Sequence, residues 1–123
     1  MHDREQLTEL LSQIHDALGR IARRIDGIES PADFRASPEG EDRLDGICMM
    51  LIAVGEGFKR IDRITNGSLL ARYPEIDWTG VKGVRDVIAH TYFDVDDEEV
   101  FEISREDIPQ LIRTVEKMLQ SLE

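Results

Sequence analysis

Residues 7–28, LTELLSQIHDALGRIARRIDGI, decide the fold class because their apolar positions recur at alternating steps of four and three. The positions in this series are Leu7, Leu11, Ile14, Leu18, Ile21, Ile25 and Ile28. Such spacing places them along one side of an α-helix, and charged residues such as Glu9, Asp16 and Arg20 fall on the other side. An amphipathic pattern of this kind is typical of a helix packed in a bundle.

Three further helical segments follow from the same reasoning. A long one begins at the Ser37-Pro38-Glu39 start signature and ends at Asn66-Gly67, and a shorter one runs from Trp78 to His90 with Asp77 as its cap. Residues 97–122 are periodic too, and Pro109 within them predicts two helices with a break near Ser104 and a new start around Glu106. We therefore predict an all-α, up-and-down bundle of four to five helices that forms a single domain over residues 1–123.

Two smaller features refine this prediction. Ser30-Pro31 is another helix-start signature, and it indicates a short turn from which Phe34 reaches the core. Gly55 and Gly57 lie inside the long helix, where each costs about 1 kcal/mol relative to Ala. Close approach of a neighbouring helix is the simplest reason for leaving the space of their side chains empty.

The charge balance restricts the classes of partner. With 26 Asp and Glu against 15 Lys and Arg, the chain has a formal charge of −11. Non-specific binding to nucleic acid depends on Lys and Arg that neutralise phosphates, so any nucleic acid must meet a local basic site.

The apolar segments and the single cysteine indicate whether the protein enters a membrane and whether it binds a metal ion. The longest mostly apolar run, Ile47 to Val54, is too short to cross a bilayer, and no signal-peptide core follows Met1, so we expect a soluble cytoplasmic protein without a membrane partner. The single cysteine, Cys48, lies in an apolar stretch and reads as a small buried hydrophobe. No Cys/His cluster has zinc-ligand spacing and no cofactor motif is present, so we expect neither a metal nor a cofactor.

The best candidate for chemistry lies around His90. Asp86 is four positions before His90, so on a helix its carboxylate can accept a proton from the imidazole and orient it. Arg85 is five positions away and converges on His90 only near a helix end. The spacing alone leaves two interpretations open. In one the pair is catalytic, and in the other His90 caps the helix C-terminus while Arg85 pairs with one of the many carboxylates.

The pattern Arg85-x4-His90-x-Tyr92 gains weight from its neighbours. It is followed by Phe93-Asp94-Val95-Asp96 and preceded by Tyr73-Pro74-Glu75-Ile76-Asp77-Trp78. The blocks Val54-Gly55-Glu56-Gly57-Phe58-Lys59-Arg60 and Asp107-Ile108-Pro109 complete the series. In this order and spacing the chain resembles the HepT-like family of the HEPN superfamily over nearly its whole length. It departs at Asp86, where many members carry Asn, and at Gly57, where Ala is common.

The resemblance implies a helical bundle that forms a homodimer and brings two copies of the motif to a shared cleft. Similar members are toxins of type VII-like toxin–antitoxin systems and act as metal-independent endoribonucleases on RNA, not DNA. Their partner is a minimal nucleotidyltransferase, MntA, which neutralises the toxin by transferring AMP to the motif tyrosine. By motif position, Arg85 and His90 become the catalytic pair, Asp86 or Thr91 orients them, and Tyr92 becomes the modified residue.

The residue chemistry agrees with that implication. Cleavage of RNA without a metal needs a base, an acid and a cation at the phosphate; His90 suits the first two roles and Arg85 the third. Two other functions stay open. The chain could be a non-catalytic HEPN scaffold that binds a nucleotidyltransferase or a nucleotide, as its acidity favours, or a helical dimer whose motif is structural.

Overall fold

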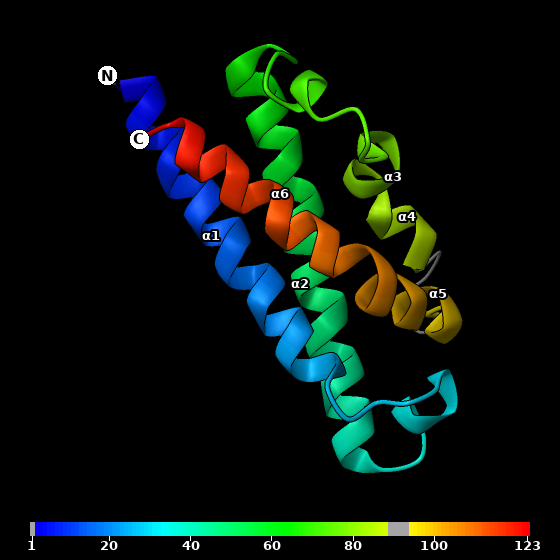
Figure 1. Cartoon of the computed structure of the whole chain (residues 1–123). Coiled ribbons are helices and arrows are strands. Elements are labelled where there is room, and N and C mark those ends of the chain that lie inside the picture. The colour runs from blue at the N-terminus through cyan, green and yellow to red at the C-terminus, as the bar shows by residue number, and fades with distance from the viewer. Residues whose placement is uncertain (1, 89–93) are drawn as a thin grey trace.

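A computed structural model describes residues 2–88 and 94–123, and no β-strand occurs among them. The helices alternate in direction along one bundle, with the two chain ends at the same end of the molecule (Figure 1). The α-helices are α1 (His2–Ile25), α2 (Pro38–Thr65), α3 (Trp78–Lys82), α4 (Val84–Ile88), α5 (Asp97–Glu102) and α6 (Ile108–Ser121). The predicted all-α bundle is therefore confirmed. None of these helices is both long enough and apolar enough to span a bilayer.

The periodic residues of α1 form its buried side as predicted. All seven positions of the series are buried, and Leu11, Leu18 and Ile21 are completely inaccessible to solvent. They pack against α2 and α6, whose most buried side chains include Ile47, Phe58, Ile61, Ile108, Val115 and Met118. The hydrogen bond between His15 Nε2 and Glu116 Oε2, 3.0 Å long, joins the outer surfaces of α1 and α6. The apolar seams thus meet in one continuous core.

The connection between α1 and α2 contains the short 3-10 helix η1 (Pro31–Phe34). Phe34 is fully buried, so the turn carries it into the core as expected. Ser37 caps α2, because its Oγ accepts a hydrogen bond from the Gly40 amide at 3.0 Å. Ser30 forms no such cap; the Asp33 carboxylate instead accepts a hydrogen bond from the Glu29 amide at 2.8 Å.

Asn66 and Gly67 end α2 as predicted. Both residues adopt positive φ angles, 55° and 79°, which Asn and Gly tolerate better than other residues. The Gly67 amide donates to the Asp62 carbonyl at 2.9 Å, which satisfies one of the last helical carbonyls. The chain then turns through η2 (Leu70–Arg72) and reverses direction.

The prediction of one continuous helix from Trp78 to His90 was wrong at Gly83, which separates α3 from α4, and its predicted end at His90 lies outside the described residues. The cause is the contact with α2. A Cβ atom at Gly55 would lie 3.0 Å from the Val81 carbonyl oxygen and 3.1 Å from Val84 Cγ1. Gly83, a poor helix former, lets the chain bend so that Val81 and Val84 both reach Gly55.

The prediction of two helices on either side of Ser104 is confirmed, since α5 ends at Glu102 and α6 begins at Ile108, but the junction is not a break in the helix. A π-helical turn, η3 (Ile103–Asp107), joins α5 to α6 without interruption, and α6 begins at Ile108. The Ile108 amide donates to the Ile103 carbonyl five residues back. Pro109 has no amide hydrogen and would clash with a carbonyl in a regular α-helix, so the wider turn accommodates it at the start of α6.

The close helix packing predicted at the two mid-helix glycines is confirmed. Gly55 faces the junction of α3 and α4, as described above. A Cβ atom at Gly57 would lie 2.8 Å from Ile14 Cγ1 of α1. The two glycines therefore let α2 approach the helices on two of its sides.

Candidate active site

Helix α4 presents two of the predicted site residues on its outer surface. Val84 and Ile88, four positions apart, are buried and anchor the helix on the bundle. Arg85 and Asp86 lie between these anchors and are exposed to solvent. The local sequence thus fixes α4 through its apolar residues and leaves a guanidinium and a carboxylate exposed to solvent.

The helix that precedes α4 is held firmly against α2. The Trp78 ring lies 4.9 Å from the Phe58 ring, and its Nε1 donates to the Tyr73 carbonyl at 2.9 Å. The Asp77 carboxylate caps α3 by accepting from the Gly80 amide at 3.1 Å, as predicted. These contacts position α3, and through it α4, on a fixed support.

The other three predicted residues, His90, Thr91 and Tyr92, lie outside the described residues. The chain on either side of them is tied together, because the Asp96 amide donates to the Ile88 carbonyl at 2.9 Å. Asp96 also caps α5 by accepting from the Glu99 amide at 3.1 Å. Of the five predicted site residues, the structure thus places only Arg85 and Asp86, which are adjacent on α4.

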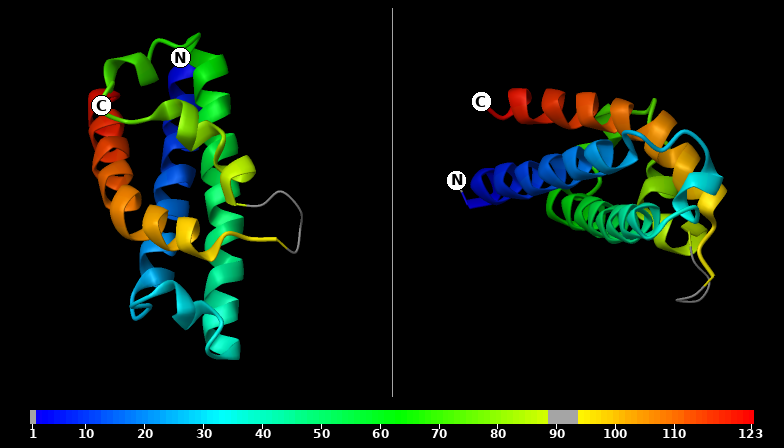
Figure 2. Two further views of the ribbon diagram at one scale, coloured as in Figure 1. Left: turned by 90° about the vertical axis from the view of Figure 1, so that its right-hand side faces the viewer. Right: turned by 90° about the horizontal axis from the view of Figure 1, so that it is seen from below.

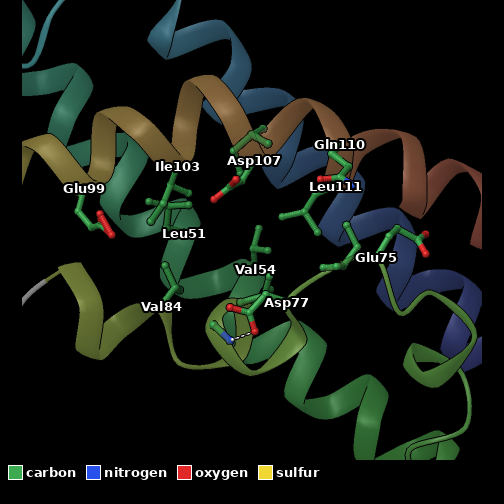
Figure 3. A pocket seen from close by; sticks show the side chains of 14 residues that line it. Leu51, Val54, Glu75, Asp77, Val84, Glu99, Ile103, Asp107, Gln110 and Leu111 are labelled. Carbon is green, nitrogen blue, oxygen red and sulfur yellow. Dashed lines mark hydrogen bonds between the residues drawn. The ribbon is translucent and has the colours of Figure 1, made fainter.

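A hollow of about 360 Å³ lies between α3–α4 on one side and α2, α5 and α6 on the other (Figure 3). Its apolar lining includes Leu51, Val54, Val84, Ile103 and Leu111, and four carboxylates, Glu75, Asp77, Glu99 and Asp107, also line it. Burial, followed by the charges of Glu106 and Asp77, raises the pKa of the Asp107 carboxyl. A cavity with this lining repels the phosphates of an RNA strand.

A second hollow, of about 460 Å³, lies where α3 meets the C-terminal part of α2. Its lining is basic: Lys59, Asp62, Arg63, Asn66, Gly67 and Lys82. Lys82 Nζ lies 2.7 Å from Asp62 Oδ2, which fixes the lysine at the mouth of the hollow. Since α3 contributes Gly80 and Val81 to the acidic hollow and Lys82 to the basic one, this stretch separates two surfaces of opposite charge.

Neither hollow was predicted from the sequence motifs, although the distribution of charge along the sequence indicates the basic one. Residues 59–85 contain six of the 15 Lys and Arg but only three of the 26 Asp and Glu. This segment thus carries a formal charge of +3, and the rest of the chain carries −14. A count of charge by segment would have located the basic surface that the overall charge of −11 hides.

Cys48 is not a nucleophile candidate. It packs against the core as predicted for a small hydrophobe, but it is half-buried and not fully buried. Burial, with smaller contributions from Asp45 and Asp97, raises the pKa of its thiol to about 11. The thiol is therefore protonated near neutral pH. Among residues 2–88 and 94–123, no group of three or more His, Cys, Asp or Glu could hold a metal ion.

Comparison with known proteins gives a family match that covers most of the chain. Residues 14–118 match the family described as "Ribonuclease HepT-like". "Putative RNase MJ0125" of Methanocaldococcus jannaschii is 33% identical over 73 residues, which is 59% of this chain and 60% of that protein. "Putative RNase MJ1216" of the same archaeon is 32% identical over 73 residues, 59% of this chain and 57% of that protein.

The match to these curated relatives is partial, because the chain spans about 60% of their length. No solved structure matches the chain significantly. The family match, in contrast, extends from the middle of α1 to near the end of α6 and includes every helix between them. The chain therefore belongs to the ribonuclease HepT-like family of the HEPN superfamily.

Proposed function

We propose that this protein is a metal-independent endoribonuclease in which Arg85 and His90 act on one phosphate of an RNA strand. The observation that carries this proposal is the family match over residues 14–118, which includes the Arg85-x4-His90-x-Tyr92 motif. The exposed position of Arg85 on the anchored helix α4 supports it.

The chemistry follows from the two side chains. His90 accepts the proton of the ribose 2′-hydroxyl, whose oxygen attacks the neighbouring phosphorus, and protonated imidazole returns a proton to the leaving 5′-oxygen. The bond between phosphorus and that oxygen breaks, and a 2′,3′-cyclic phosphate remains. The Arg85 guanidinium binds the non-bridging oxygens and stabilises the charge that develops on them. DNA lacks the 2′-hydroxyl and is not a substrate.

Asp86 and Thr91 are the candidates for orienting the catalytic pair. Asp86 is exposed beside Arg85 on α4, where its carboxylate can hold the imidazole in one tautomer or repel the substrate phosphate. The two alternatives predict opposite effects of the substitution Asp86→Asn on the rate of cleavage.

Regulation of this activity is proposed to occur at Tyr92 in a cytoplasmic toxin–antitoxin pair. An MntA-like nucleotidyltransferase would transfer AMP from ATP to the phenol; a phosphorus–oxygen bond forms to the tyrosine, pyrophosphate leaves, and the phenolic proton passes to solvent. Tyr92 is two positions from His90, so the added anion would block the phosphate site by its bulk and its charge. A homodimer would place two Arg85 side chains in one cleft and concentrate positive charge within an acidic protein.

A second candidate function is a non-catalytic scaffold that binds a nucleotidyltransferase. The observation that favours it is the acidic hollow, whose carboxylates surround an apolar floor and would suit a basic partner protein (Figure 3). A scaffold does not need Arg85 or His90, so their removal would leave its function intact.

Cleavage of RNA in the presence of EDTA tests the proposal. Purified protein, shown by intact mass to carry no AMP, is incubated with total RNA beside His90→Ala of matched thermal stability. We expect the parent alone to cleave. Cleavage by both proteins would remove His90 from the mechanism, and cleavage by neither would favour the scaffold. A melting temperature that falls in His90→Ala without loss of cleavage would indicate that the motif is structural.

A further inference from the structure

The basic hollow is the feature of the structure that the catalytic motif does not explain. Three cations and one carboxylate line it, so its formal charge is +2 in a protein whose total is −11. Lys59 and Arg63, four positions apart on α2, form one wall, and Lys82 of α3 forms the other. Gly67, which has no side chain, leaves the end of the hollow open.

Two of the three cations are positioned by ion pairs, and the charge of the third, Arg63, is not balanced within the hollow. Lys82 pairs with Asp62 at 2.7 Å, and Lys59 pairs with Glu56 at 3.1 Å on its exposed side. Arg63 is exposed and forms no ion pair with any residue in the described part of the chain. A planar guanidinium at the rim, with two positioned ammonium groups, can receive a phosphate through charge-assisted hydrogen bonds.

The hollow lies close to Arg85 along the chain, because Lys82, which lines it, is three positions before Arg85. Gly83 interrupts the helix between these two residues, and three residues of chain span at most about 11 Å, so Lys82 and Arg85 arise from neighbouring points of the backbone. Val81 and Val84 of the same stretch line the acidic hollow. Helices α3 and α4 both pack on α2, beside which they lie in Figure 2.

We propose that Lys59, Arg63 and Lys82 form a subsite for a backbone phosphate of the RNA strand, next to the phosphate that Arg85 holds. This inference rests on the proposed function, because it assigns a second contact to the same substrate. The subsite is independent of base identity, since it reads phosphate only. With the acidic hollow across α3–α4, it sets the path along which a single strand reaches the motif.

The test compares a long single-stranded RNA with a dinucleotide, which has no neighbouring phosphate. In the double variant Lys59→Gln/Arg63→Gln, kcat/KM for the long RNA relative to the dinucleotide falls about tenfold, and the dependence of binding on salt weakens by about 0.7 per cation removed. Arg113→Gln, at an exposed arginine of α6 outside the hollow, serves as the control for a general loss of positive charge.

Three results distinguish failure of the subsite from failure of the proposed function. If the double variant keeps the parental ratio of kcat/KM for the long RNA to kcat/KM for the dinucleotide, the subsite is overturned. Cleavage of RNA by the parent would then still support the proposed function. An equal fall in Arg113→Gln also overturns the subsite, because the effect would then be one of total charge. If the parent cleaves neither substrate, the proposed function fails, and binding of 2′-O-methyl RNA decides the subsite: weaker binding by the double variant than by Arg113→Gln supports it, and equal binding overturns it.

Discussion

At the scale of the residue, Asp86 decides how well the motif can work. Its carboxylate is exposed beside Arg85, where it either orients His90 or opposes the substrate phosphate. The predicted path of RNA along the basic flank makes repulsion the stronger effect, because the phosphate must pass the end of α4. We therefore expect Asp86→Asn to raise kcat/KM for RNA by about threefold to tenfold.

The measurement is the initial rate of cleavage at low and at high salt. Repulsion is screened by salt, so the advantage of the asparagine variant should shrink as salt increases. A loss of activity at both salt concentrations would contradict this prediction and assign Asp86 the orienting role. Asp16→Asn, at an exposed position on α1, controls for the change in net charge.

Cys48 provides a pH-dependent prediction at the same scale. Burial raises the pKa of its thiol to about 11, so the folded protein holds very little thiolate near neutral pH. Iodoacetamide should alkylate the folded chain about 100-fold more slowly than the urea-unfolded chain at neutral pH, and the rate should rise about tenfold per pH unit toward the pKa. Equal rates in the two states, measured by mass spectrometry, would show that the thiol is not protected.

At the scale of the element, alanine substitutions at two glycines of α2 are expected to change the stability of the protein by different amounts. A Cβ atom at Gly40 would collide with the backbone carbonyls of Asp33 and Phe34, which cannot move without displacing η1. At Gly57 the nearest atoms are Cγ1 and Cδ1 of Ile14, and a side chain can adjust. Gly40→Ala should therefore destabilise the protein by about 1–3 kcal/mol.

Gly57→Ala should stay within about 1 kcal/mol of the parent. The gain in helix propensity, about 1 kcal/mol, offsets the displacement of Ile14. Thermal unfolding followed by circular dichroism compares the two variants. The same melting temperature for both would contradict the distinction between backbone and side-chain contacts at these positions.

The elements also show what the sequence could and could not predict. Spacing alone identified the buried sides of α1, α2 and α6, because each repeats its apolar residues over several turns. It failed at Gly83 and at residues 103–107, where the outcome depends on the contact of Val81 with Gly55 and on how the chain accommodates Pro109. Such local departures are set by tertiary contacts that periodicity does not contain.

The candidate site, too, could be predicted from the sequence only in part. The motif identified Arg85 and Asp86, and the structure shows them exposed together on α4. The hollows on the two sides of α3–α4 could not be predicted, because Lys59 and Lys82 are 23 positions apart and meet only when α3 packs on α2. Charge counted by segment indicates a basic region, but only the fold separates it from the carboxylates at Glu99 and Asp107.

At the scale of the whole molecule, charge and assembly are linked. A chain of −11 attracts RNA weakly from a distance, so a shared cleft with two copies of Arg85 would help to hold the phosphate. We expect sedimentation equilibrium to give a mass near twice the 14.1 kDa of the chain. A monomer that cleaves RNA at the same rate per chain over a wide range of concentration would show that the second copy is not needed.

The most direct measurement of the central claim is the chemistry of the cleaved ends. AMP-free protein is incubated in EDTA with a defined RNA and with the same strand carrying 2′-deoxyribose at each mapped cleavage position. The account predicts cleavage of the RNA alone, a 2′,3′-cyclic phosphate on the upstream product and no product from His90→Ala. Cleavage at the 2′-deoxy positions, or strand scission only after a divalent metal is added, would contradict it.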